Sequence, residues 1–162
     1  MSSTERVLER VRSLGVSHEI LSIDSADADT VVFCEKYGYP LEQSGNTIIV
    51  ASKKEPKAYA ACVVLATTRL DVNKRVRHLL GVSKLSFATA EEMQELTGME
   101  VGGVTPFALP DEMPLYVDSR LMELEWVILG GGGRDRKVRI APEALLKLGA
   151  EVVSDLALPL KA

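Results

Sequence analysis

Two β-rich runs separated by a short polar stretch most constrain what this chain can fold into. Residues 46–52 (Asn-Thr-Ile-Ile-Val-Ala-Ser) and 59–66 (Tyr-Ala-Ala-Cys-Val-Val-Leu-Ala) favour strands, and residues 53–57 between them read Lys-Lys-Glu-Pro-Lys. Strand-forming runs on either side of a polar segment of this length predict a β-hairpin. The chain is therefore expected to contain an antiparallel strand pair with a charged connection.

The remaining elements alternate between helices and strands along the chain. Apolar spacing, capping residues and glycine stops predict helices at 4–14, from 25 or 27 to 37, 71–80, 89–98 and 142–148. Further strands are predicted at 18–23, 84–88, 115–117, 126–129, 137–140 and 151–153. Because strands come in hairpins with helices interspersed, a mixed sheet of α+β type is favoured over a doubly wound parallel sheet.

Length and composition indicate one soluble domain covering residues 1–162. Apolar residues make up 46% and charged residues 26%, which is ordinary for a globular protein. Neither a membrane-spanning run nor a signal-peptide core is evident, so a cytoplasmic location is expected. Cys34 and Cys62 lie far apart among apolar residues and are expected to be buried free thiols.

The charge distribution limits the kinds of partner that the protein can bind. A net charge of −4 argues against autonomous binding dominated by nucleic-acid phosphates, which needs a basic footprint. Basic clusters do occur, among them residues 134–139, and each is expected to be a solvated face or turn. The two histidines and two cysteines form no ligand spacing, so neither a metal nor a cofactor is predicted.

A glycine-rich loop after the fourth predicted helix is the first candidate for a binding site. Thr89 and Glu92 have the spacing of a capping box, the helix ends at Gly98, and residues 102–106 read Gly-Gly-Val-Thr-Pro. Paired glycines let backbone amides approach a ligand, and such a loop can hold a carbonyl, carboxylate or phosphate oxygen. Taken alone, the segment is more often a turn than a binding loop.

The order of several short motifs resembles the YbaK family, also called the prolyl-tRNA synthetase associated (INS-like) editing domain. The resemblance covers about residues 25–156. The set comprises residues 68–71 (Thr-Arg-Leu-Asp), Lys74, residues 86–89 (Ser-Phe-Ala-Thr), 91–92 (Glu-Glu), 96–98 (Leu-Thr-Gly), 102–106, 115–118 (Leu-Tyr-Val-Asp) and the four glycines 130–133. Members of this family hydrolyse mischarged aminoacyl-tRNA, typically tRNA for proline carrying cysteine or alanine. The resemblance implies a single α+β domain whose mixed, mostly antiparallel sheet is partly barrel-like.

The resemblance also implies a set of site residues. Gly102 and Pro106 match the family loop that holds the aminoacyl group, and Asn46 stands where the family has a lysine that meets the phosphate or sugar of the terminal adenosine. Asn46, Gly102 and Pro106 are the residues expected to carry catalysis. The residues expected to bind substrate are Thr47, Gly103, Val104, Thr105, Asp118, Gly130, Gly131 and Gly132. Two alternatives stay open, since Asp118 could instead cap the turn at 119–121 and the glycines could form a flexible hairpin tip.

Two functions of different classes remain. The first is a trans-acting aminoacyl-tRNA deacylase that removes a small mischarged amino acid of the cysteine or alanine type from tRNA, particularly tRNA for proline. The second is a non-catalytic module that binds the tRNA 3′ end, an aminoacyl-nucleotide or a synthetase partner. Asn46 separates them, because an uncharged amide binds phosphate less strongly than an ammonium group does. The expected partner is the acceptor end of aminoacyl-tRNA, with a synthetase as a further candidate.

Overall fold

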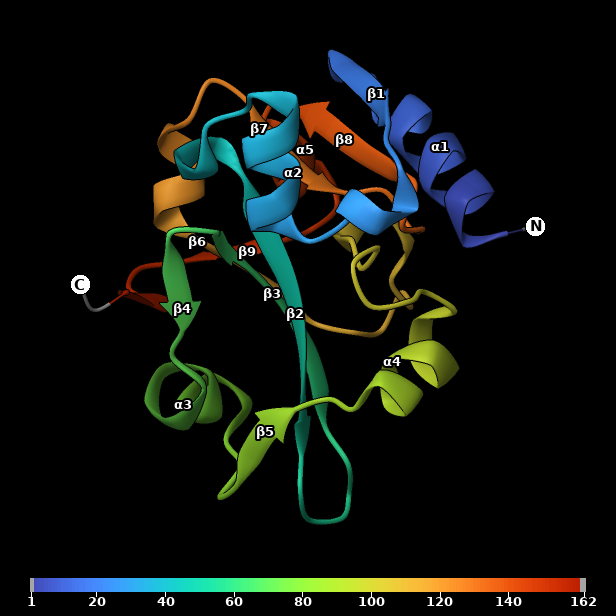
Figure 1. The fold of residues 1–162 in the computed structure, drawn as a ribbon. Coiled ribbons are helices and arrows are strands. Elements are labelled where there is room, and N and C mark those ends of the chain that lie inside the picture. The colour runs from blue at the N-terminus through green and yellow to red at the C-terminus, as the bar shows by residue number, and fades with distance from the viewer. Residues whose placement is uncertain (1, 161–162) are drawn as a thin grey trace.

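The predicted hairpin, β2 (Gly45–Ser52) and β3 (Tyr59–Leu65), runs through the length of the molecule in the computed structural model, which describes residues 2–160 (Figure 1). The other strands are β1 (His18–Ser22), β4 (Thr68–Leu70), β5 (Leu85–Phe87), β6 (Leu115–Asp118), β7 (Val127–Gly130), β8 (Arg136–Ile140), β9 (Glu151–Val153) and β10 (Ala157–Pro159). The α-helices are α1 (Ser3–Ser13), α2 (Thr30–Tyr37), α3 (Arg77–Leu80), α4 (Ala90–Thr97) and α5 (Glu143–Lys147).

The strands form three sheets of five, three and two strands. Their orders are β5-β2-β3-β6-β9, β1-β8-β7 and β10-β4. Only the β3–β6 and β6–β9 pairs are parallel, and the other strand pairs among residues 2–160 are antiparallel. An isolated bridge between Ser44 and Ile128 brings the start of β2 against β7, so the two larger sheets meet there. The α+β class with a mixed, mostly antiparallel arrangement is confirmed.

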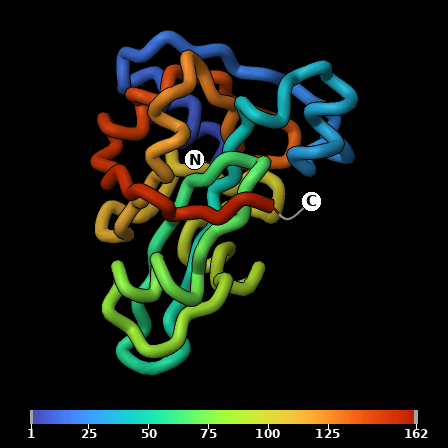
Figure 2. Tube along the Cα trace, turned by 90° about the vertical axis from the view of Figure 1, so that its left-hand side faces the viewer, coloured from blue at the N-terminus to red at the C-terminus, as the bar shows by residue number. Residues whose placement is uncertain are grey.

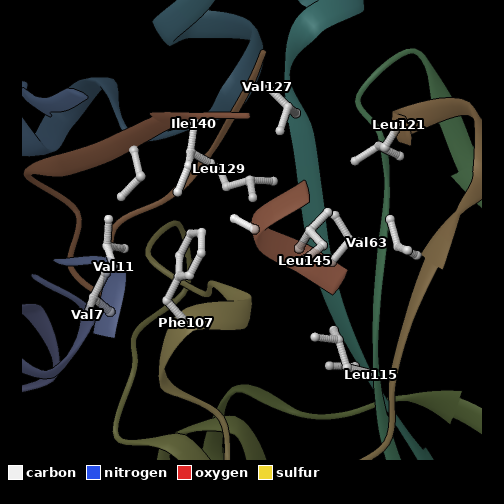
Figure 3. Close-up of a cluster of buried hydrophobic side chains, with 14 of the residues drawn as sticks. Val7, Val11, Val63, Phe107, Leu115, Leu121, Val127, Leu129, Ile140 and Leu145 are labelled. Carbon is white, nitrogen blue, oxygen red and sulfur yellow. The ribbon is translucent and has the colours of Figure 1, made fainter. Parts of the chain in front are cut away.

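Both faces of the hairpin are buried, which explains its nearly continuous apolar sequence. Ile49 and Val63 belong to a core that also contains α1 and α5 residues, whereas Val50 and Cys62 belong to a second core beside β4. Strand residues alternate between faces, so successive residues of β2 enter different cores. Figure 3 shows the first core, where side chains from the two larger sheets, α1 and α5 converge.

The starts of two helices differ from the sequence prediction. Helix α2 begins at Thr30, because the Asp29 carboxylate accepts hydrogen bonds from the amides of Val31 and Val32. Asp71 does cap its segment by accepting from the Lys74 amide, but residues 72–76 form a π-helical turn before α3. Local spacing identified both segments and could not fix which polar residue acts as the cap of α2.

The pairing of β4 with β10 was not predicted, since both strands are only three residues long. Figure 2 shows this last strand crossing beside β4, on the side of the molecule away from α4. Other expectations hold: the reciprocal Thr89–Glu92 capping box starts α4, and Cys34 and Cys62 are buried free thiols. Within residues 2–160, none of the helices has the length and apolar character needed to cross a bilayer.

Candidate functional site

A cavity of about 380 Å³ lies where β2, the start of α2, the loop after α4 and the adjoining ends of β7 and β8 come together. Its volume falls within the range of small-molecule sites. Five of the residues expected from the sequence line it: Asn46, Thr47, Gly102, Val104 and Gly130. The fold therefore brings three features together: Asn46, where the family has a lysine, the glycine-rich loop and the start of the glycine run.

Asn46 is fixed in this cavity by the start of α2. The hydroxyl of Thr30 donates to Asn46 Oδ1 over 2.7 Å, and both residues line the cavity. With Oδ1 occupied in this way, the Asn46 Nδ2 amide is the group that can donate to a ligand. The site thus presents a neutral, oriented donor where the resemblance expected a cation.

Thr47, the next residue of β2, carries an unused polar group. Its hydroxyl is buried and has no hydrogen-bond partner among the described residues, and the residue lines the cavity. Buried polar atoms in folded proteins almost always have a partner in protein or solvent. The Thr47 hydroxyl is therefore a buried, unpaired polar group beside the cavity rather than a group exposed to it.

Gly102 lies at the point where the loop meets the cavity wall. Its φ is +92°, a conformation that side chains rarely adopt, and an added Cβ would meet the Arg134 guanidinium and lie 3.2 Å from Ala28 Cβ. Arg134 itself donates to the Val101 carbonyl over 2.8 Å. Glycine at this position therefore makes room for Arg134 beside the cavity.

The glycine run is buried against other backbone. The Gly132 amide donates to the Gly103 carbonyl over 2.8 Å, and an added Cβ on Gly103 would lie 2.8 Å from backbone atoms of Gly133. Gly130 ends β7 and lines the cavity, whereas Gly131 packs against Arg136 and Gly132 against Ser3 and Val7 of α1. The run begins the hairpin connection between β7 and β8, as the hairpin alternative predicted, and it also packs tightly against the loop.

Other expected site residues lie outside the lining of this cavity. Gly103 and Thr105 are buried within the loop, and Pro106 lines a separate surface depression beside Arg6 and Phe107. Gly131 and Gly132 also lie outside the lining.

Asp118 is fully occupied by protein groups. Its carboxylate accepts from the Arg120 amide, the Arg120 guanidinium and the Ala157 amide, each over 2.9 Å. The first of these bonds caps the 3₁₀ turn Ser119–Glu123, as the capping alternative predicted. The side chain holds β6 to the start of β10 rather than facing the cavity.

Lys137 is a cavity residue that the sequence analysis missed. The basic cluster at 134–139 was expected to be solvated, but Lys137 is only 5% exposed and lines the cavity. It lies on β8 opposite Gly130, and its Nζ donates to the Ala28 carbonyl over 2.8 Å. Burial lowers the pKa of Lys137 below its ordinary value of 10.5. No local signal in the sequence marks Lys137, because its burial follows from the packing of β8 against Ala28 and Phe33.

The cavity contains no set of metal ligands. Across residues 2–160, no cluster of three or more histidine, cysteine, aspartate or glutamate residues could hold an ion. Burial raises the pKa of the Cys62 thiol to about 12, and this thiol lies in the second core, away from the cavity lining. The polar side chains that line the cavity are therefore the Asn46 amide, the hydroxyls of Thr30 and Thr47, the Asp29 carboxylate that caps α2, and the basic groups of Arg134 and Lys137.

Comparison with known proteins identifies the family. The model of the aminoacyl-tRNA editing domain matches residues 25–148, and the chain belongs to this family. The resemblance seen in the sequence is confirmed.

Relatives and solved structures agree with this assignment. The chain is 28% identical over 114 residues to the uncharacterized protein YwhH of Bacillus subtilis, covering 65% of this chain and 71% of YwhH. It is 24% identical over 127 residues to a protein of Enterococcus faecalis named "Putative Cys-tRNA(Pro)/Cys-tRNA(Cys) deacylase EbsC", covering 78% and 74% of the two chains. A crystal structure described as "a putative trans-editing enzyme for prolyl tRNA synthetase" superposes with a TM-score of 0.80 at 26% identity, covering 95% and 96%. The crystal structure of a hypothetical protein superposes with a TM-score of 0.83 at 28% identity, covering 94% of this chain and 99% of the other.

Proposed function

We propose that this protein is a trans-acting aminoacyl-tRNA deacylase. It would hydrolyse the ester between a small misattached amino acid, of the cysteine or alanine type, and the 3′ end of tRNA, particularly tRNA for proline. The observation that carries the proposal is the convergence of Asn46, Gly102 and Gly130 on one cavity of about 380 Å³. The similarity to EbsC, whose name specifies Cys-tRNA, supports the substrate class.

The cavity lining favours catalysis by positioning. Neither histidine nor cysteine is among the lining residues, and the Asp29 carboxylate is engaged in capping α2. An aminoacyl ester is already activated, so donors aimed at its carbonyl oxygen can stabilise the charge that develops when water attacks. The Asn46 amide and the amides of the Gly102 loop are the candidate donors.

The amino-acid side chain would lie against the apolar part of the wall. Ala88, Met93 and Val104 line the cavity on the side of α4 and its following loop. A small apolar or thiol side chain can contact such a surface without burying an unpaired polar group. Hydrolysis adds water across the ester bond and releases the free amino acid and the terminal ribose hydroxyl.

Binding without turnover is the second candidate, and Asn46 is the observation that favours it. In this alternative the cavity would hold the tRNA 3′ end or an aminoacyl-nucleotide, or the protein would act with a synthetase partner. An uncharged amide at this position supplies a weaker hydrogen bond to phosphate than a lysine would.

The test is a deacylation panel with separate measurement of binding. Cys-tRNA and Ala-tRNA for proline are compared with correctly charged Pro-tRNA and with Cys-tRNA for cysteine, using wild type and Asn46→Ala. We expect hydrolysis of the mischarged species and a loss of about tenfold or more in Asn46→Ala, from removal of one transition-state donor. Binding of these tRNAs with no hydrolysis of any would overturn the deacylase and support the alternative.

A further inference from the structure

Lys137 is a buried cation without an anionic partner. The residue is 5% exposed, and none of the salt bridges among residues 2–160 involves it. Its one hydrogen bond goes to the carbonyl of Ala28, although an ammonium group has three donors. At least two donors are therefore unused in a residue that lines the cavity.

Its other neighbours leave the charge uncompensated. The Phe33 ring centroid lies 5.4 Å from Nζ, close enough for a cation–π contact. Cys34 and Asp29 favour the charged form and Arg134 opposes it, but the Asp29 carboxylate, which lines the same cavity, caps α2 and forms no salt bridge with Lys137. A buried charge that lacks a close counter-ion destabilises the fold, and buried charges in proteins are normally paired, so an anionic ligand would supply what Lys137 lacks.

The geometry joins Lys137 to the predicted catalytic position. Lys137 Nζ bonds the carbonyl of Ala28, and Asn46 Oδ1 accepts from the hydroxyl of Thr30, two residues further along. All four residues line the same cavity. Unused donors from two different sheets thus face one volume that a ligand rich in acceptor oxygens would fill.

We propose that Lys137 is the anion-binding residue of this cavity and takes a phosphate of the nucleotide end of the substrate. The inference rests on the proposed function, which places a tRNA 3′ end here. Phosphates are the anionic groups of an aminoacyl-tRNA, whereas the α-amino group of the amino acid is cationic and would be repelled. The positive charge that is missing at Asn46 on β2 is supplied from β8.

The experiment compares adenosine 5′-monophosphate with adenosine, because these two probes differ only in the phosphate. Each is titrated by calorimetry or NMR into wild type, Lys137→Met, Lys137→Gln and Lys54→Met. The glutamine variant keeps a donor for the Ala28 carbonyl without the charge, and Lys54 is an exposed lysine outside the cavity. Thermal melts confirm that each variant is folded.

Wild type and Lys54→Met are expected to bind the nucleotide at least about tenfold more tightly than the nucleoside, as befits a charge-assisted bond. Both Lys137 variants should bind the two probes equally. A preference for the nucleotide that survives in both Lys137 variants, or no preference in wild type, would overturn the inference.

Deacylation is measured on the same samples, so that the two proposals can fail separately. A phosphate preference that depends on Lys137 without turnover would remove the deacylase and keep the anion site. Turnover without that preference would keep the deacylase and remove the anion site.

Discussion

Lys137 and Asn46 lie far apart in the sequence, but both form hydrogen bonds with the same short segment, residues 28–30. Lys137 Nζ bonds Ala28, and Asn46 Oδ1 accepts from Thr30, at the turn that leads into α2. Both side chains are therefore oriented by protein groups before any ligand binds, which is what a positioning site requires. If the two residues share one task, charge at either position should serve it.

Exchanging the charge between the two positions tests this directly. We expect Lys137→Met to lower kcat/KM on Ala-tRNA or Cys-tRNA for proline by about tenfold or more. Asn46→Lys alone should change little, because Lys137 already supplies the cation, and in the Lys137→Met background it should restore much of the loss. A double variant no better than Lys137→Met would show that the positions act independently.

Lys137 should also reduce stability. Replacing it with methionine removes an uncompensated buried charge but also loses the bond to the Ala28 carbonyl. We expect a net gain of about 1 kcal/mol at neutral pH, or about 2–4 °C in Tm. The control, Lys54→Met, should leave Tm unchanged.

The stability difference should depend on pH with a definite sign. Because burial lowers the pKa of Lys137 below 10.5, the unfolded chain binds this proton more tightly than the folded protein does. Wild-type stability therefore rises, relative to the variant, as pH increases through the folded pKa toward 10.5. An advantage of Lys137→Met that grew over this interval would contradict a buried, charged lysine.

Gly102 should be required for activity more than for folding. An added methyl group at φ +92° would displace the Arg134 guanidinium from the cavity edge. We expect Gly102→Ala to lower kcat/KM about tenfold while the backbone strain reduces stability by about 1 kcal/mol. Gly149→Ala is a matched control, because Gly149 also has a positive φ, +88°, but has open space around it. A drop in Tm with unchanged activity would mean that the loop is only a turn.

At the scale of the elements, Asp118 secures the short strand pair that the sequence did not reveal. Its carboxylate bonds the amide of Ala157 at the start of β10, and the Arg120 guanidinium bonds both that carboxylate and the carbonyl of Ala157. A three-residue strand has few ladder bonds of its own, so β10 depends on this side chain for its position against β4.

Asp118→Ala should therefore destabilise the protein without touching the cavity. Loss of a buried acceptor leaves two amides and a guanidinium short of a partner, and we expect a decrease of about 2–3 kcal/mol in the free energy of unfolding. Asp155→Asn is the control, because Asp155 also contacts Arg120 but is 83% exposed. Unfolding in urea gives both values. Equal effects of the two substitutions would show that the buried bonds contribute little.

At the scale of the whole molecule, net charge and cavity together set how RNA can bind. A charge of −4 provides no broad basic footprint, while Lys137 and Arg134 place two cations at the cavity. Recognition of the tRNA end should then involve few phosphates.

The salt dependence of tRNA binding measures how many phosphates the protein contacts. Two contacts to single-stranded RNA predict that log K falls with log salt with a slope of about −1.4. In Lys137→Met the slope should become shallower by about 0.7. A slope of about −5 or steeper would show that the protein contacts the tRNA over a wide surface instead.

The sequence by itself determined the parts of this protein that depend on neighbours along the chain. The β2–β3 hairpin, the Thr89–Glu92 capping box and the glycine stops are set by strand propensity, capping and backbone freedom, all of which act locally. The ordered motifs also sufficed to identify the editing family.

Only the tertiary structure decided what the polar residues with distant partners do. Nothing near Asp118 in the sequence shows that Ala157 lies beside its carboxylate, or that Pro106 faces away from the cavity that Gly102 lines. Lys137 appears among three arginines as one more surface charge, and becomes a buried cation because β8 pairs it with Gly130 and α2 covers it. Burial and pairing between distant segments are properties of the packed chain, so local pattern cannot supply them.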